Sequence, residues 1–195
     1  MLMQGRIRVW IIAASVVGLA ALAAVSWLSY RNTRELIAAN QRLAQAHKLI
    51  EDLTGLHLLL DDAESSCRGY ALSGKDEYLK PYDAALVQVD ISTQVLRHDV
   101  AHDTNRSLQF QQLEPTIRAR LEVLKELVNA RRNGGFEAAV GVVQSNRGKR
   151  LADEIRQRIS LMQTEERNDL LDLERESRER ARTTILAVGL TCLLG

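Results

Sequence analysis

The sequence predicts an all-α protein, an antiparallel four-helix bundle whose long first and fourth helices are continuous with two transmembrane helices. Three observations indicate this fold. Apolar residues recur at three- and four-residue spacing through most of residues 31–182, and this is the period of one helix face. The chain has only 2 prolines, which would interrupt helices, and only 4% aromatic residues, which favour strands, so the composition favours helices over a sheet. Uncharged segments lie near both ends of the chain.

Residues 9–30 carry no charge and are long enough to cross a membrane as a helix. Aromatic rings lie near both ends of this segment, where they favour the membrane interface. A signal peptide cleaved near residues 21–23 is the alternative, but the apolar run continues past that point. Residues 183–195 are also uncharged and too short to span. We expect them to begin a second membrane helix, truncated in a piece of a longer protein.

The first bundle helix is expected over residues 31–72. Its apolar residues form two heptad rows. One row is Leu36, Leu43 and Ile50, and the other is Ala39, Ala46, Leu53 and Leu60. Ser73 and Gly74 should end this helix, and Asp76 is a candidate N-cap for the next.

Three further long helices and one short helix are expected before residue 182. The second has its apolar stripe at Leu79, Tyr82, Leu86, Val89, Thr93, Leu96 and Val100. The third has Phe110, Leu113, Ile117, Leu121, Leu124 and Val128, with a kink or late start at Pro115. A short helix over 136–143 follows the Asn133–Gly135 break, and the fourth long helix covers 147–182 with Leu151, Ile155, Ile159, Met162 and Leu170.

Two stretches of sequence resemble a known family. DAESSCRGYALSGKDEYLKPY (residues 62–82) looks like the signature of the third type of the CHASE domains, extracellular sensory domains associated with cyclases and histidine kinases. GKRLADEIR (residues 148–156) is a second, less specific match. The resemblance covers residues 31–182. Cys67 and Ala152 depart from the pattern, where we expect a polar residue and Met.

The resemblance implies a sensory input domain of a bacterial receptor in the cytoplasmic (inner) membrane. Residues 1–8 would be a cytoplasmic tail, residues 9–30 the first membrane helix and residues 31–182 a periplasmic or extracellular domain. The output would be a histidine kinase of a two-component system, or alternatively a diguanylate cyclase or chemoreceptor. A structural, membrane-tethered dimerisation module is the competing hypothesis. No catalytic motif occurs in the sequence, so we expect no activity in this chain itself.

Candidate ligand-binding or signalling residues cluster in the two matching stretches. Glu64 and Arg68 have the favourable acid-first spacing of four on a helix. Antiparallel first and fourth helices would bring them near Lys149, Asp153 and Arg156. This cluster is either an anion or carboxylate site, or an ion network that fixes helix register.

Tyr70, Tyr78 and Tyr82 lie around the first hairpin and could line a ligand cleft, although Tyr82 also fits the core stripe.

Other functions have weaker support in the sequence. His98 and His102 have metal-compatible spacing but lack a third ligand with motif spacing, so we expect no metal and no cofactor. The formal net charge of +1 gives no reason to expect nucleic acid as a partner. The expected partners are the lipid bilayer, an unknown small-molecule or protein signal, and a second copy in a parallel homodimer. Dimer contacts are expected in a membrane-proximal stalk, about residues 31–45 and 168–182, where Leu36, Leu43, Leu170 and Leu173 need cover.

Overall fold

The computed structural model describes the backbone of residues 2–194. Side chains are described for residues 29–175, for residues 178 and 179, and for part of residues 16–27. The chain divides into two units, Met1–Ala44 and Gln45–Gly195. Across the described residues every regular element is helical and no strand occurs, so the all-α prediction is confirmed.

The first unit is the N-terminal part of helix α1 (Leu2–Ser73). Its described side chains include an ion pair between Arg31 Nε and Glu35 Oε1 at 3.3 Å. Much of the predicted membrane segment 9–30, and all of 183–195, lies outside the described side chains. Over the residues with described side chains, no helix is long and apolar enough to cross a membrane.

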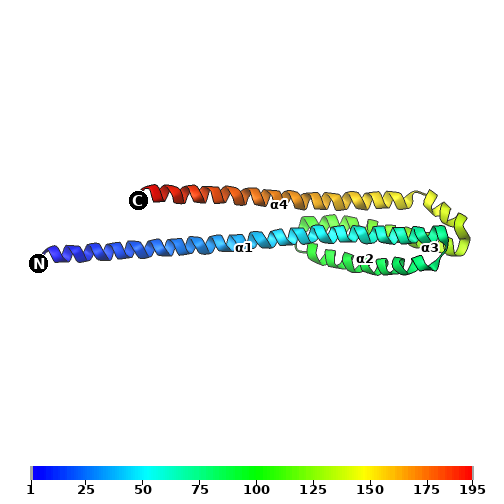
Figure 1. The fold of residues 1–195 in the computed structure, drawn as a ribbon, viewed down its shortest axis with the longest axis horizontal. Coiled ribbons are helices and arrows are strands. Elements are labelled where there is room, and N and C mark those ends of the chain that lie inside the picture. Colours follow the sequence, from blue (N-terminus) through cyan, green and yellow to red (C-terminus); the bar gives the residue numbers. More distant parts are fainter. Residues whose placement is uncertain (1, 195) are drawn as a thin grey trace. The chain divides into compact units, whose positions relative to one another are not determined.

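The second unit holds the rest of α1, the 3-10 helix η1 (Asp76–Tyr78), α2 (Leu79–Val100), α3 (Thr104–Gln144) and α4 (Arg147–Leu194). Short connections reverse the chain after each helix, so successive helices are antiparallel (Figure 1). We call the end that contains the α1–η1 and α3–α4 connections the closed end. The α2–α3 connection lies at the opposite end of the unit (Figure 1).

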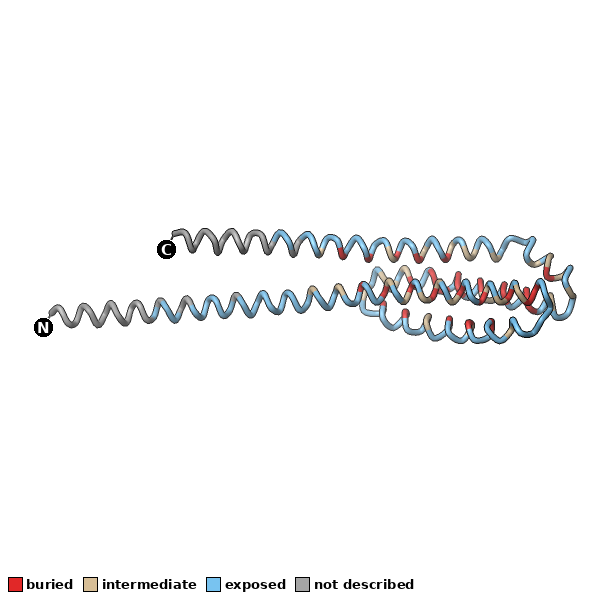
Figure 2. Tube along the Cα trace, in the orientation of Figure 1, coloured by how far each residue is buried: buried red, intermediate tan, exposed pale blue. Residues whose placement is uncertain are grey.

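Side chains from all four helices form the core of this unit. Figure 2 shows the buried positions as a stripe along the helices. One apolar cluster joins Leu53 and Leu56 of α1 with Leu96 of α2, Phe110 of α3 and Ile159 of α4. A second cluster, which includes Cys67, Tyr70, Tyr82, Leu124 and Val128, joins α1, α2 and α3. The predicted stripes of α2, α3 and α4 are buried at most of their positions.

The register of α1 differs from the prediction in one of its two rows. Ala46, Leu53 and Leu60 are buried, which confirms most of one row. Leu36 is 59% exposed, and Leu43 and Ile50 are only partly buried, so the other predicted row is wrong. The second buried row is instead Leu49, Leu56, Ala63 and Tyr70.

Helix ends also differ from the prediction in detail. Asp76 lies inside η1, and the N-cap of α2 is Tyr78 without a side-chain cap, so the proposed Asp76 cap is wrong. Helix α3 begins at Thr104 and contains Pro115, so its start is not delayed to the proline. The side chain of Asp103 caps it by accepting a hydrogen bond from the Arg106 backbone N–H at 3.0 Å. Gly135, with φ of 78°, interrupts the helical backbone before the expected 136–143 helix.

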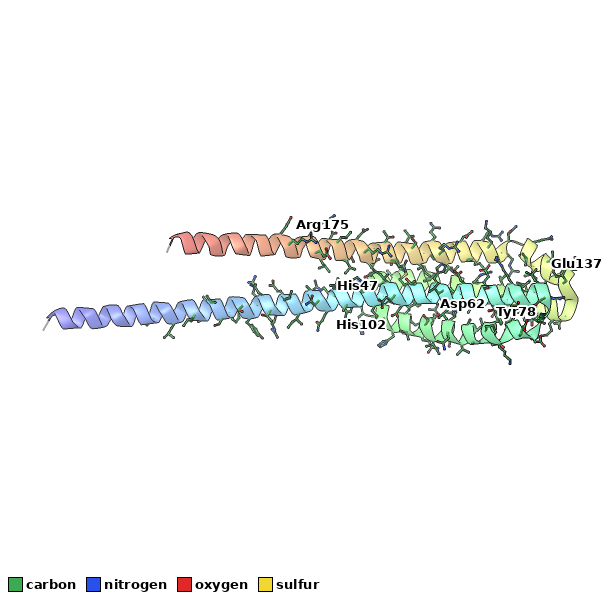
Figure 3. All side chains as sticks on the ribbon, viewed as in Figure 1. His47, Asp62, Tyr78, His102, Glu137 and Arg175 are labelled. Carbon is green, nitrogen blue, oxygen red and sulfur yellow. The ribbon has the colours of Figure 1, made fainter. Side chains whose placement is uncertain are left out.

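Gly69 brings the first hairpin together, because its missing side chain makes room for an aromatic ring. A Cβ at this position would lie 2.5 Å from Cδ1 of Tyr78, which is closer than real Cβ contacts allow. The ring of Tyr78 therefore packs directly on α1, and Figure 3 shows this residue at the closed end. This close contact explains why position 69 is a glycine.

We expect Gly69→Ala to lower the free energy of unfolding by about 1–3 kcal/mol, because the added methyl group forces the Tyr78 ring away. Gly55→Ala is the matched control, since Gly55 lies in the same helix with nothing within 4 Å of the place that an added methyl group would take. The control should stabilise the chain by about 0.5–1 kcal/mol through helix propensity. Urea unfolding in mild detergent, followed by circular dichroism, measures both. Equal shifts for the two variants would contradict the packing explanation.

Candidate functional site

The closed end contains an ion cluster that is centred on Glu64 of α1. The Arg68 Nη2 atom, one helical turn later, lies 2.5 Å from Glu64 Oε1, so the predicted pair forms. The Arg68 side chain is 64% exposed, whereas that of Glu64 is only 18% exposed. Arg68 therefore reaches this carboxylate from the solvent side.

Arg120 of α3 is the second cation on the same carboxylate, and sequence reasoning missed it. Its Nη2 atom pairs with Glu64 Oε2, and its side chain is only 6% exposed. A buried guanidinium is costly unless it is paired, so Glu64 is the counterion that permits this burial. The available signal was its position, because Arg120 falls between Ile117 and Leu124 at core spacing.

Gly148, in the first turn of α4, makes room for this arginine. A Cβ at Gly148 would collide with Nη1 of Arg120. The backbone of α4 therefore lies directly against the buried guanidinium. Three helices, α1, α3 and α4, meet at this single ion pair.

A cavity of about 170 Å³ opens beside the cluster. Its charged lining residues are Glu64, Arg68, Arg120 and Lys149, and its apolar ones include Val123, Leu127, Val142 and Val143. Lys149 has no ion-pair partner among the residues that the structure describes. The cavity therefore combines excess positive charge with an apolar wall.

Asp153 and Arg156 lie away from this cavity. They pair with each other on α4, with 3.1 Å between Arg156 Nη1 and Asp153 Oδ1. Both side chains are more than half exposed, at 55% and 57%. The structure thus brings Glu64 and Arg68 together with Lys149, and it leaves these two residues on the outer surface of α4.

The three tyrosines contribute to packing and do not line the cavity. Tyr70 and Tyr82 are 5% and 4% exposed, and both belong to the second core cluster. Burial raises the pKa of Tyr82 to about 12, and its hydroxyl has no hydrogen-bond partner in the described structure. Tyr78 is 38% exposed and covers Gly69.

Cys67 lies in the same core and is a poor nucleophile. Its Sγ donates a hydrogen bond to the Leu124 carbonyl oxygen at 3.3 Å. Burial raises the pKa of this thiol to about 11, so it stays protonated at neutral pH. The side chain therefore acts as a small core residue.

His98 and His102 lie near the end of the unit opposite the closed end, where Figure 3 labels His102. The rings of His98 and His102 are edge to face, with centroids 6.3 Å apart, and both residues are exposed. Over the described residues, no group of three or more potential metal-ligating side chains comes together.

Two other partly buried ion pairs tie the helices together. Arg97 of α2 donates to Glu114 of α3 at 2.6 Å, and this hydrogen bond holds the pKa of Glu114 below its usual value. Arg106 of α3 contacts both carboxylate oxygens of Glu166 in α4, at 2.6 and 2.7 Å. Burial nevertheless raises the pKa of Glu166, because the loss of solvation outweighs these contacts.

These two carboxylates should give opposite pH dependence. The Glu114 contribution to stability is present above its unfolded pKa near 4.5 and is lost as pH falls through its lower folded pKa. The Glu166 contribution is present below 4.5 and is lost as pH rises through its raised folded pKa. Each slope is at most about 1.4 kcal/mol per pH unit.

Glu114→Gln should remove the increase in stability with rising pH below 4.5. Glu166→Gln should remove the decrease in stability with rising pH above 4.5. Thermal melts of the two variants and the parent chain between about pH 3 and about pH 8, a range that brackets the ordinary carboxylate pKa values, measure both effects. Parallel pH curves for all three proteins would contradict both assignments.

Comparison with known proteins identifies the family and the fold. The sequence profile of the CHASE3 domain matches residues 39–176. The structure is similar to the crystal structure of the Rhodopseudomonas palustris histidine kinase HK9 sensor domain, with a TM-score of 0.60 and 21% identity. That match covers 65% of this chain and 98% of the HK9 chain. No curated protein matches the sequence.

Proposed function

The chain belongs to the CHASE3 domain family, and we propose that it is the membrane-anchored, extracytoplasmic sensory input of a bacterial histidine kinase. The family match covers most of the described bundle and supports a sensory role. The similarity of the structure to the HK9 sensor domain supports the four-helix fold. In this proposal residues 31–182 receive the signal, and the kinase output lies outside this chain.

One observation of the structure carries the proposed transmission of signal. Helix α4 runs without interruption from Arg147, beside the closed-end cavity, to Leu194. Its 48 residues make a rod about 70 Å long. A shift of its first turn would therefore be passed along the helix toward the C-terminus.

Membrane anchoring is supported by the sequence of the two ends. Residues 9–30 lack charge, and residues 183–195 follow a highly charged stretch of α4. We assign residues 1–8 to a cytoplasmic tail, 9–30 to the first anchor and 183–195 to the start of the second.

Labelling in intact bacteria tests the proposed sidedness. Leu72 is 71% exposed at the end of α1, so Leu72→Cys offers an accessible thiol, whereas native Cys67 is buried and native Cys192 belongs to the proposed second anchor. A thiol reagent that does not cross membranes should modify this variant in intact cells and leave the parent chain unmodified. Modification only after lysis would contradict an extracytoplasmic domain.

A chimera tests the sensory role. Residues 1–195 are joined to the cytoplasmic part of a histidine kinase, and autophosphorylation is measured in membranes. Gly148→Ala, whose added methyl group would collide with the Arg120 guanidinium, should change kinase output at least several-fold, whereas Gly141→Ala, with nothing within 4 Å of the added methyl group, should not. Identical output from both variants would favour a structural dimerisation module.

We also propose a parallel homodimer, as paired kinase outputs require. In the first unit, Leu36 and Ile37 are 59% and 52% exposed, and in the second unit Leu171 is 50% exposed. A second copy in the same membrane would cover such apolar residues, and the shared anchors raise its effective concentration.

Cysteines at Leu36, Leu43 and Leu173, scanned with their neighbours in a Cys67→Ser background, should crosslink between chains with helical periodicity. Uniform absence of crosslinks, with a monomeric mass in mild detergent, would contradict the dimer.

A further inference from the structure

The cavity at the closed end carries more positive than negative charge. Three of its lining side chains are cations, Arg68, Arg120 and Lys149, and its one carboxylate is that of Glu64. Both oxygens of Glu64 are already engaged, one by Arg68 and the other by Arg120. Lys149 is left without an ion-pair partner in the described structure. An anion placed between Arg68 and Lys149 would complete the charge balance of the cavity.

The apolar wall of the cavity comes from α3. Val123 and Leu127 belong to the bundle part of this helix, and Val142 and Val143 belong to the segment after Gly135. The volume of about 170 Å³ is close to that of an apolar cavity known to hold benzene, about 150 Å³. A body the size of a benzene ring or a branched five-carbon chain therefore fits against these side chains.

We propose that this cavity binds a compact organic monocarboxylate, with its carboxylate between Arg68 and Lys149 and its apolar body on the valine and leucine wall. The inference rests on the proposed sensory function and names the ligand class for that function. Inorganic anions would leave the apolar wall uncovered. Neutral apolar molecules would leave Lys149 without a counterion.

Such a ligand would connect the helices that matter for transmission. Arg68 belongs to α1, the apolar wall to α3, and Lys149 to the first turn of α4. A carboxylate that bridges Arg68 and Lys149 favours the arrangement in which α4 lies close to α1. Binding would thereby shift the population of α4 positions.

Calorimetric titration of the full 195-residue chain in nanodiscs of a zwitterionic lipid tests the inference. Benzoate and isovalerate are the probes, benzamide is the neutral isostere of benzoate, and inorganic phosphate is the anion without an apolar body. Empty nanodiscs provide the blank. At least one carboxylate should bind saturably, and benzamide and phosphate should bind at least about tenfold more weakly, since a charge-assisted contact contributes a factor of that order.

Arg68→Gln and Lys149→Gln should each weaken carboxylate binding about tenfold or more. Both positions are exposed, so these variants keep the fold, and circular dichroism verifies it. Arg156→Gln is the matched control, because Arg156 is an exposed arginine outside the cavity, and it should leave affinity unchanged.

Three results would overturn the inference: no saturable binding of either carboxylate, equal binding of benzoate and benzamide, or equal loss of affinity in all three variants. Tight phosphate binding in place of the carboxylates would overturn it as well. These outcomes are separate from failure of the proposed function. A chain that is labelled from outside and controls the chimeric kinase, yet ignores carboxylates, keeps the sensory role and refutes only the ligand class.

Discussion

Glu64→Leu is expected to lower the free energy of unfolding by about 3–5 kcal/mol, the usual cost of removing one partner of a buried ion pair. The substitution leaves the Arg120 guanidinium, whose side chain is 6% exposed, without its carboxylate. The missing side chain at Gly148 lets the α4 backbone lie against that guanidinium. Urea unfolding of the full chain in mild detergent, followed by circular dichroism, measures the loss.

Arg68→Gln is the matched control, because it removes the other cation of the same carboxylate. The Arg68 side chain is 64% exposed, so its loss should cost less than about 1 kcal/mol. The double variant Glu64→Leu/Arg120→Met should recover much of the stability lost in Glu64→Leu, since no unpaired charge then stays buried. Equal losses in the free energy of unfolding for Glu64→Leu and Arg68→Gln would mean that Arg120 is solvated, and they would contradict the buried ion pair.

Much of the architecture was predictable because helix periodicity and chain breaks agree in this sequence. The stripes of α2, α3 and α4 lie in segments where few other apolar residues compete, and residues such as Val89, Ile117 and Ile159 are buried as expected. The Gly74 and Asn146 breaks adopt positive φ angles of 70° and 54°, which end helices by a local conformational preference. Such local signals can be read without knowledge of the partner helices.

The register of α1 could not be read in the same way, because this helix is apolar on several faces. Leu49 and Ile50 are adjacent, and Leu58, Leu59 and Leu60 are consecutive. More than one pair of heptad rows can be drawn through such a segment. Contacts with α2, α3 and α4 decide which row is buried, and these contacts are not encoded within α1.

The candidate site was half predictable for a related reason. Glu64 and Arg68 interact within one helix, so their spacing of four predicts the contact. Arg120 comes from a different helix, and its burial depends on the absence of a side chain at Gly148 in a third. Long-range charge pairing of this kind leaves only one trace in the sequence, a charged residue at a core position.

The corrected register of α1 gives the second large expected effect. Leu56→Ala should lower the free energy of unfolding by about 2–5 kcal/mol, the range measured for deletion of a fully buried leucine side chain. Leu56 is 0% exposed and packs in the cluster that all four helices share. The transfer free energy of the lost methyl groups and the cavity left behind both contribute to this cost.

Leu58→Ala is the matched control, because Leu58 lies in the same helix two residues away and is 58% exposed. It should change stability by no more than about 0.5 kcal/mol. Ile50→Ala separates the two registers, since the predicted row buries Ile50 and the structure leaves it only partly covered. Denaturant unfolding that ranks Leu56 first, Ile50 second and Leu58 last agrees with the structure. A larger loss for Ile50 than for Leu56 would restore the predicted row, because the residue whose truncation costs more is the one that the partner helices cover.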